Sequence, residues 1–157
     1  MKLLGTVKSD LDVRRAVLDM AQKKKQIIHG ARATNQQLPV PLRKKTVDYD
    51  VYTKKPEQSA KELASKLNKE FGSKFKVVQG LHKGTYKVKK GKETVADYTQ
   101  VTKRPKTVNK FGVQYAKVDY AKRKLQKLVR DEKTAFRRDK DLDTLNRIKK
   151  GLRKYEW

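Results

Sequence analysis

Three aspartates are the residues of this chain whose spacing most clearly predicts chemistry. Asp48 and Asp50 lie two residues apart in residues 46–53, where apolar and acidic side chains alternate as they do in a strand. Side chains two apart on a strand point to the same side, so both carboxylates can reach one cation. Asp97 lies in a second apolar segment, residues 94–98. If the two strands are neighbours, three carboxylates meet and form an oxygen ligand set suited to Mg²⁺ or Mn²⁺ in phosphoryl transfer.

Each of these aspartates also has an ordinary interpretation. An Asp-x-Asp pair is common on the polar side of an edge strand, where both carboxylates face water. The candidate metal site therefore depends on whether Asp97 lies beside Asp48 and Asp50 in the folded chain.

A glycine-containing turn precedes the aspartate pair and is a candidate phosphate-binding element. Gly30, Ala31 and Arg32 follow the apolar run Ile27-Ile28-His29. Backbone amides at such a turn can hold the phosphates of a nucleoside triphosphate, and Arg32 adds a positive charge. The same residues also fit a plain strand-to-helix turn. The P-loop and Rossmann glycine patterns are absent from the sequence, which excludes those nucleotide-binding classes.

The elements that must position these residues alternate between helix and strand. Apolar periodicity predicts helices over residues 9–25, with Ser9 as the cap, and over 31–37, 56–71, 115–130 and 133–155. Pro56 is expected to begin the helix over 56–71, and Gly72 to end it. The apolar stripes expected to be buried are Val13, Ala16, Val17 and Met20 in the first helix, Ala60, Leu63, Ala64, Leu67 and Phe71 in the helix over 56–71, and Leu142, Leu145, Ile148 and Leu152 in the last helix. Strands are predicted over residues 27–29, 46–53, 75–78, 85–89 and 94–98, with a loop over 99–110. The predicted fold class is α/β (α+β), a small mixed sheet flanked by helices. Residues 1–100 would form the core, and residues 101–157 a basic helical extension packed on it.

The charge of the chain predicts a polyanionic partner. The 42 Lys and Arg residues exceed the 17 Asp and Glu residues by 25 charges. The excess is +6 in residues 1–50, +7 in residues 51–100 and +12 in residues 101–157. Dispersed basic side chains that neutralise phosphates release counter-ions, and this release favours binding to nucleic acid. Nucleic acid is therefore the favoured partner. The candidate nucleic-acid-binding residues are Lys117, Arg123, Lys124 and Lys127 of the helix predicted over 115–130.

The sequence contains no apolar run of membrane-spanning length, so no transmembrane helix is expected. An anionic membrane surface is a weaker alternative to nucleic acid as the polyanion, and no membrane is included among the predicted partners. Its first five residues are too short to hold a signal-peptide apolar region. The absence of cysteine excludes disulfide scaffolds, zinc ribbons and thiol nucleophiles. These features fit a cytoplasmic or nucleic-acid-associated location, with a virion as the alternative.

The order of these motifs resembles the nucleotidyltransferase superfamily, the DNA polymerase beta-like fold. A strand, a glycine-containing turn, a short helix, an Asp-x-Asp strand, a helix and a strand with a third aspartate follow one another over residues 9–100. The resemblance implies that Asp48 and Asp50 hold the catalytic cation and that Asp97 is the third carboxylate. It also implies that Gly30, Ala31 and Arg32 contact the triphosphate. Ala31 departs from the family pattern, which has Gly or Ser at that position.

Two function classes follow from these observations. The resemblance implies an enzyme that transfers a nucleotide from a nucleoside triphosphate to a nucleic-acid or protein acceptor, with Mg²⁺ or Mn²⁺. The alternative is a catalytically inactive basic protein that keeps the fold and binds nucleic acid or a protein partner in an assembly such as a virion. Joint stabilisation by a divalent cation and a triphosphate separates the two classes.

Overall fold

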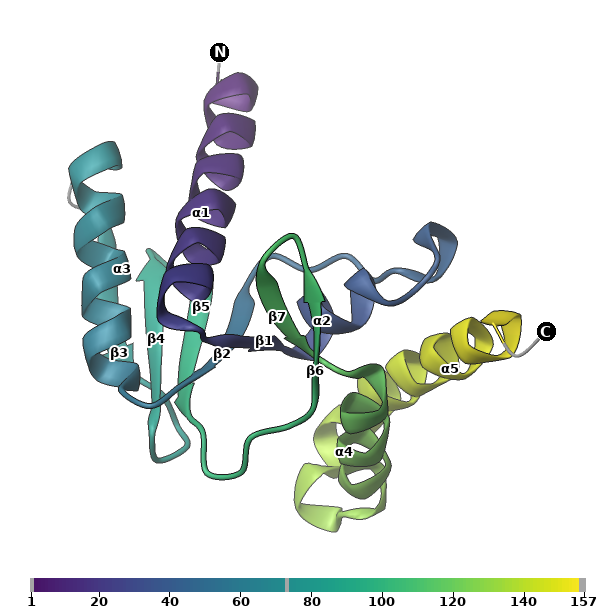
Figure 1. Cartoon of the computed structure of the whole chain (residues 1–157). Helices are drawn as coiled ribbons and strands as arrows, with labels where there is room; N and C mark the ends of the chain where they lie inside the picture. The colour runs from purple at the N-terminus through teal and green to yellow at the C-terminus, as the bar shows by residue number, and fades with distance from the viewer. Residues whose placement is uncertain (1, 73, 156–157) are drawn as a thin grey trace.

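The computed structural model describes the backbone of residues 2–72 and 74–155, and the side chains of residues 11–72 and 74–151. Along this part of the chain, helical elements and strands alternate as far as α3, after which five strands and then three helical elements follow (Figure 1). The helical elements are α1 (Lys2–Lys24), α2 (Gly30–Gln36), η1 (Val40–Leu42), α3 (Pro56–Phe71), α4 (Val118–Arg130), η2 (Glu132–Arg137) and α5 (Arg138–Tyr155). The strands are β1 (Ile27–His29), β2 (Tyr49–Thr53), β3 (Phe75–Gln79), β4 (Thr85–Lys90), β5 (Glu93–Gln100), β6 (Thr107–Lys110) and β7 (Val113–Ala116).

The strands form one mixed sheet in the order β3-β4-β5-β2-β1-β7-β6. Strand β2 runs parallel to β5, and β1 runs parallel to β7, whereas the other neighbouring pairs are antiparallel. The predicted α/β class with a mixed sheet and flanking helices is confirmed. Because β2 is a central strand, its Asp-x-Asp pair is not the polar side of an edge strand.

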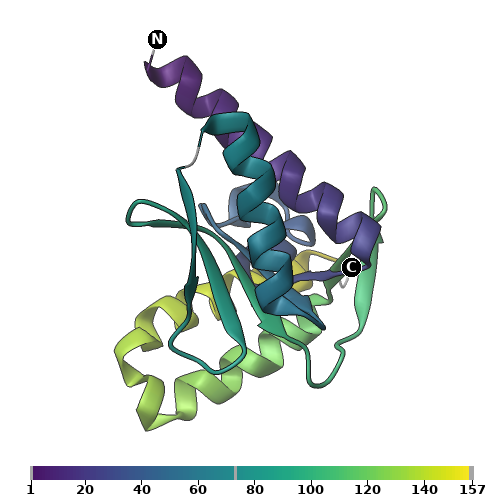
Figure 2. The same cartoon turned by 90° about the vertical axis from the view of Figure 1, so that its left-hand side faces the viewer.

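Helices α1 and α3 lie side by side against the sheet (Figures 1 and 2). Their predicted apolar stripes are buried, and about 2 kcal/mol is typical for burying each large aliphatic side chain. The buried stripe residues are Val13, Ala16, Val17, Met20, Ala60, Leu63, Ala64 and Leu67. Pro56 opens α3, and Gly72 ends it in the left-handed conformation at φ +75°, as the sequence predicts.

The helices that follow the sheet pack on one another and on the helical elements α2 and η1. Helix α4 contacts α5 and α2, and α5 contacts η1. Leu145 and Ile148 of α5 are buried as predicted, but Leu142 is 42% exposed. Asp141 takes the buried position instead and pairs with Arg137 at 3.1 Å. The buried side of α5 therefore agrees with the prediction at Leu145 and Ile148 and differs only in its first turn, where Asp141 is buried in place of Leu142. The predicted burial of Leu152 falls outside the described side chains.

Several predicted boundaries are wrong. Helix α1 begins at Lys2, so Ser9 lies inside it and is not its cap. Strand β2 begins at Tyr49 instead of residue 46. The predicted loop over 99–110 contains β6, and α4 begins at Val118 because the preceding residues form β7. Strand β7 pairs with β1, so the segment after residue 100 adds strands to the sheet as well as helices. No helix within the described residues is long and apolar enough to cross a membrane.

Candidate functional site

The three aspartates meet at the middle of the sheet. Asp50 on β2 and Asp97 on β5 are direct partners in the parallel β2–β5 register. Asp48 immediately precedes β2 and points to the same place, so one carboxylate oxygen from each residue lies within 4.8 Å of the others. The sequence alone could not establish whether Asp97 lies beside Asp48 and Asp50. In the structure it does.

The cluster is electrostatically costly without a cation. Burial, followed by repulsion from Asp48 and Asp97, raises the pKa of Asp50 to about 7. Nζ of Lys87 on β4 donates a hydrogen bond to Oδ1 of Asp97 at 2.9 Å, and the Asp97 side chain is only 14% exposed. Three converging carboxylates with open coordination positions are the hard oxygen donor set that Mg²⁺ and Mn²⁺ accept. The residues present therefore fit a divalent cation.

Gly30 forms the wall of the cluster at the end of β1. Its φ of +66° lies in the left-handed region, which glycine adopts without steric cost. A Cβ atom at this position would overlap Oδ2 of Asp50. Glycine is therefore required here both by the backbone conformation and by the close approach of the carboxylate. Ala31 follows it in the first turn of α2.

Arg32 is tied to the segment that carries the aspartates. Its Nη2 donates a hydrogen bond to the carbonyl oxygen of Val47 at 2.8 Å, and its guanidinium lies 4.2 Å from the ring centre of Tyr49. This bond holds the backbone immediately before Asp48, in residues 46–48, which the sequence predicts as strand but which precede β2. The structure thus gives Arg32 a positioning contact, and its role in binding a nucleotide stays a prediction.

A cluster of aromatic side chains that sequence reasoning did not assign lies beside Asp50. His29, which pairs with Asp50 in the β1–β2 register, is stacked on Tyr52 with ring centres 3.6 Å apart. The hydroxyl groups of Tyr52 and Tyr120 are 2.8 Å apart and share a hydrogen bond. Burial, followed by the charge of Lys124, lowers the pKa of His29 to about 3, so its ring is neutral at physiological pH. Period-two spacing of Asp50 and Tyr52 was the one sequence signal that could have found this cluster.

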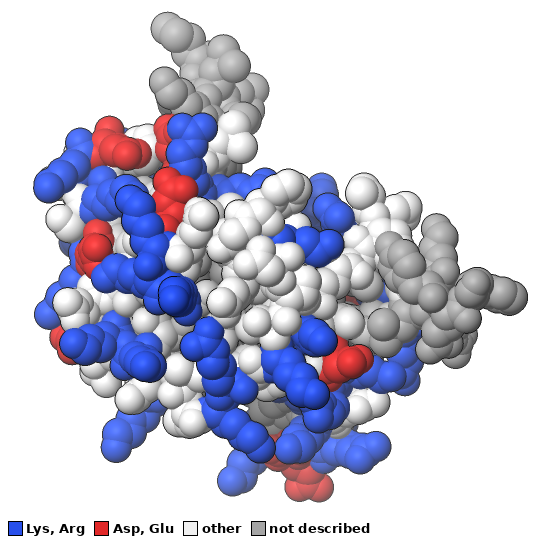
Figure 3. Space-filling model, in the orientation of Figure 1, with Lys and Arg blue, Asp and Glu red and all other residues white. Residues whose placement is uncertain are grey.

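The predicted nucleic-acid-binding residues of α4 are exposed. Lys117 is the residue before α4, and Arg123, Lys124 and Lys127 lie on the helix with side chains in solvent. Nζ of Lys124 is 3.5 Å from the hydroxyl oxygen of Tyr52, which places this lysine next to the carboxylate cluster. Basic side chains cover much of the visible surface, and acidic ones are scattered among them (Figure 3). The role of the α4 residues in binding nucleic acid stays a prediction.

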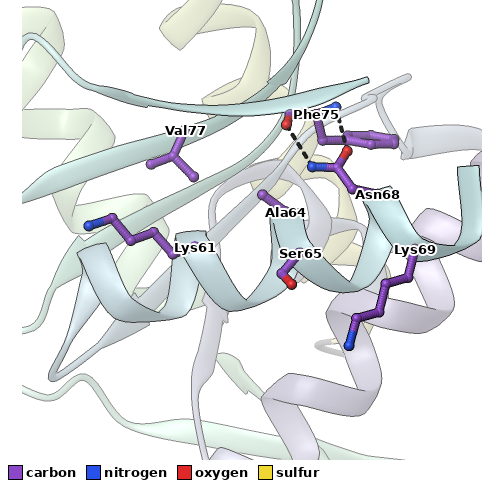
Figure 4. A pocket seen from close by; sticks show the side chains of 7 residues that line it. All are labelled: Lys61, Ala64, Ser65, Asn68, Lys69, Phe75 and Val77. Carbon is purple, nitrogen blue, oxygen red and sulfur yellow. Dashed lines mark hydrogen bonds between the residues drawn. The ribbon is translucent and has the colours of Figure 1, made fainter. Parts of the chain in front are cut away.

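The grooves found along α3 lie away from this cluster. One of about 490 Å³ lies between α3 and β3 and is lined by Lys61, Ser65 and Asn68 (Figure 4). Asn68 joins the two elements because its side chain exchanges hydrogen bonds with the backbone of Phe75 at 2.8 and 3.0 Å. A neighbouring groove of about 710 Å³ is also free of the three aspartates. The carboxylate cluster therefore lies outside both grooves.

Comparison with known proteins identifies the family. The family model of the poly(A) polymerase catalytic subunit matches residues 15–128, well over half of the chain. The chain belongs to this family, and it has the nucleotidyltransferase fold that the order of its motifs predicts. The matched range includes the glycine turn, the three aspartates and most of α4.

A solved structure of a viral enzyme has the same fold. The chain is similar to the polyadenylate synthase of Megavirus, with a TM-score of 0.75 and 18% sequence identity. The match covers 93% of this chain and 32% of that one, so the chain spans about a third of the length of the viral enzyme. It is also similar to an antigenic nucleotidyltransferase-like protein from Paracoccidioides brasiliensis, with a TM-score of 0.47, 18% identity and coverage of 87% and 74%. No curated protein matches the chain.

Proposed function

We propose that this protein transfers adenylate from ATP to the 3′ hydroxyl of an RNA acceptor, with Mg²⁺ or Mn²⁺. The observation that carries this proposal is the convergence of Asp48, Asp50 and Asp97 within 4.8 Å. Membership of the poly(A) polymerase family supports ATP and RNA as the substrates. In this reaction the acceptor oxygen forms a bond to the α-phosphorus of ATP, the bond between the α and β phosphates breaks, and pyrophosphate leaves.

The carboxylates have complementary roles in this scheme. Asp48 and Asp50 would hold the cation on the triphosphate, and Asp97 would help to activate the acceptor hydroxyl. A bound divalent cation supplies charge neutralisation for the attacking and leaving oxygens. Burial, followed by repulsion from Asp48 and Asp97, raises the pKa of Asp50. The repulsive part supports this assignment, because it is relieved when positive charge is bound between the aspartates.

The remaining candidate residues surround the carboxylates. The Gly30–Ala31 turn, together with Arg32, would orient the β and γ phosphates, and Gly30 holds Asp50 at close range. Lys124 would attract the polyanionic substrates from the α4 side, since its ammonium already lies beside Tyr52. Each of these residues would act by positioning and charge, which supply most of the rate enhancement in phosphoryl-transfer enzymes.

The alternative proposal is a catalytically inactive protein that binds nucleic acid or a structural partner with its basic surface. Two observations favour it, namely Ala31 at a position where the superfamily has Gly or Ser, and the Lys87–Asp97 ion pair, which already neutralises one carboxylate. The net charge of +25 serves either proposal.

Thermal unfolding with ligands tests the two proposals. The enzyme is expected to be stabilised by Mn²⁺ and a non-hydrolysable ATP analogue together, by more than the sum of their separate effects. The Asp48→Asn/Asp50→Asn variant should lose this joint stabilisation. Equal unfolding midpoints for the wild type with and without the two ligands would favour the inactive binding protein.

A further inference from the structure

The segment that forms β3 and β4 carries a basic surface that extends beyond the candidate site. Residues 74–92 contain seven lysines and no aspartate or glutamate. A run of this length without an acidic residue contrasts with α3, whose exposed lysine Lys61 pairs with Glu57 at 3.1 Å. The charge of β3 and β4 is therefore not balanced within its own segment.

The strand register places part of this charge beside the carboxylates. Lys87 on β4 is the direct partner of Asp97 on β5, which in turn is the direct partner of Asp50 on β2. Lys89 lies two residues further along β4 and pairs with Lys76 on β3. Because alternate residues of a strand point to the same side, these three lysines share the side of the sheet that carries Asp97.

This side of β3 and β4 is open to solvent. The core that α3 shares with these strands is formed from the opposite side by Phe75 and Val88, with Val77 packed against it. On the lysine side Val78 is 44% exposed and Lys76 is exposed. A polymer can therefore lie against this side without displacing a helix.

We propose that the acceptor RNA strand runs from the carboxylates along the open side of β4 and β3, with its phosphates contacted by Lys87, Lys89 and Lys76. Lys87 and Lys89 lie about 6.6 Å apart along β4. Lys76 faces Lys89 from β3, so the three ammonium groups are neighbours that can contact nearby phosphates of an extended strand. Lys87 joins the surface to the chemistry, because its ammonium holds Asp97 at 2.9 Å. The identity of the polymer rests on the proposed function, and the location of the surface rests on the register and exposure.

Charge reversal at the far end of the surface tests the proposal. In Lys76→Glu/Lys89→Glu, binding of a fluorescent single-stranded oligo(A) RNA is expected to weaken about tenfold or more. The dependence of log affinity on log salt should fall by about 1.4, since each single-strand phosphate contact contributes about 0.7. The matched control is Lys23→Glu/Lys69→Glu, which makes the same charge change on α1 and α3 and should bind within about twofold of the wild type. Lys87 is left intact because its loss would unpair Asp97.

The outcomes are distinguishable from those of the proposed function, because binding is measured without turnover. Equal weakening in both double variants would show attraction by net charge alone and would overturn the proposal. Wild-type affinity in Lys76→Glu/Lys89→Glu would overturn it as well, as would competition by polyglutamate as effective as that by poly(A). A neutral Lys76→Gln/Lys89→Gln variant, with the wild-type circular dichroism spectrum, should show an intermediate loss of affinity. If transfer activity is present, the KM for RNA should rise while the KM for ATP stays unchanged.

Discussion

Gly30 and Asp50 depend on each other at the scale of single residues. Gly30→Ala would place a Cβ atom on Oδ2 of Asp50 and would force alanine to adopt φ +66°. The conformational strain alone costs about 1–3 kcal/mol, and displacement of Asp50 adds to it. We expect a lower free energy of unfolding in urea and a loss of joint cation and nucleotide binding.

Gly91→Ala provides a matched control for this prediction. Gly91 has a similar φ of +63°, and a Cβ atom there would meet nothing within 4 Å. It should therefore show the strain without the loss of ligand binding. Equal effects of the two variants on ligand binding would contradict the role assigned to the Gly30–Asp50 contact.

The raised pKa of Asp50 predicts how stability depends on pH in EDTA. The pKa is about 7 in the folded protein and 3.8 as its ordinary value, so the unfolded state releases this proton at lower pH. Asp50 therefore contributes a loss of stability as pH rises from about 4 to about 7. Asp50→Asn removes this pH-dependent contribution. The unfolding midpoint of the variant minus that of the wild type should therefore increase by several degrees between about pH 4 and about pH 7. A difference that does not vary with pH would refute the raised pKa, which burial and then repulsion from Asp48 and Asp97 produce.

At the scale of elements, a hydroxyl pair fastens α4 to the sheet beside the site. The Tyr52 and Tyr120 hydroxyls are 2.8 Å apart, and no residue of α4 is fully buried. Tyr120→Phe should cost about 0.5–1.5 kcal/mol of stability, the usual value of one hydrogen bond. Faster amide exchange in residues 118–130 is the expected local effect. Tyr86→Phe on β4 is the control, and equal exchange in both variants would argue against the attachment.

Local patterns made the central elements predictable. Helix α3 carries its own start, stop and apolar stripe in Pro56, Gly72 and regular spacing, and each of these is confirmed. The Asp-x-Asp strand was predictable for the same reason, since alternation is a property of adjacent residues. The order of the motifs supplied the superfamily, although no single motif would have done so.

Contacts between distant segments were not predictable in the same way. Strand β7 is ordered by pairing with β1, more than eighty residues earlier, and nothing within the short segment Val113–Ala116 distinguishes it from the start of a helix. The side chain of Gln37 accepts a hydrogen bond from the backbone amide of Val118 at 2.8 Å, at the start of α4. The Lys87–Asp97 ion pair likewise depends on the β4–β5 register, which includes a bulge between Val88 and Lys89.

At the scale of the whole molecule, the net charge of +25 opposes the folded state. Salt shortens the screening length from about 10 Å at 0.1 M to about 3 Å at 1 M, so it should reduce this repulsion. We expect the thermal unfolding midpoint to rise when sodium chloride is increased over this range. An unchanged or lower midpoint would indicate that the basic residues are already compensated within the fold.

We propose that Asp48, Asp50 and Asp97 catalyse metal-dependent nucleotidyl transfer. The most direct test is incubation of the protein with radiolabelled ATP, Mg²⁺ or Mn²⁺ and an RNA primer, beside the Asp48→Asn/Asp50→Asn variant. We expect labelled, lengthened RNA with the wild type and a loss of at least about a hundredfold in rate with the variant. Equal RNA binding by both proteins, without transfer by the wild type under any of these conditions, would contradict the claim and leave a basic binding protein on a nucleotidyltransferase fold.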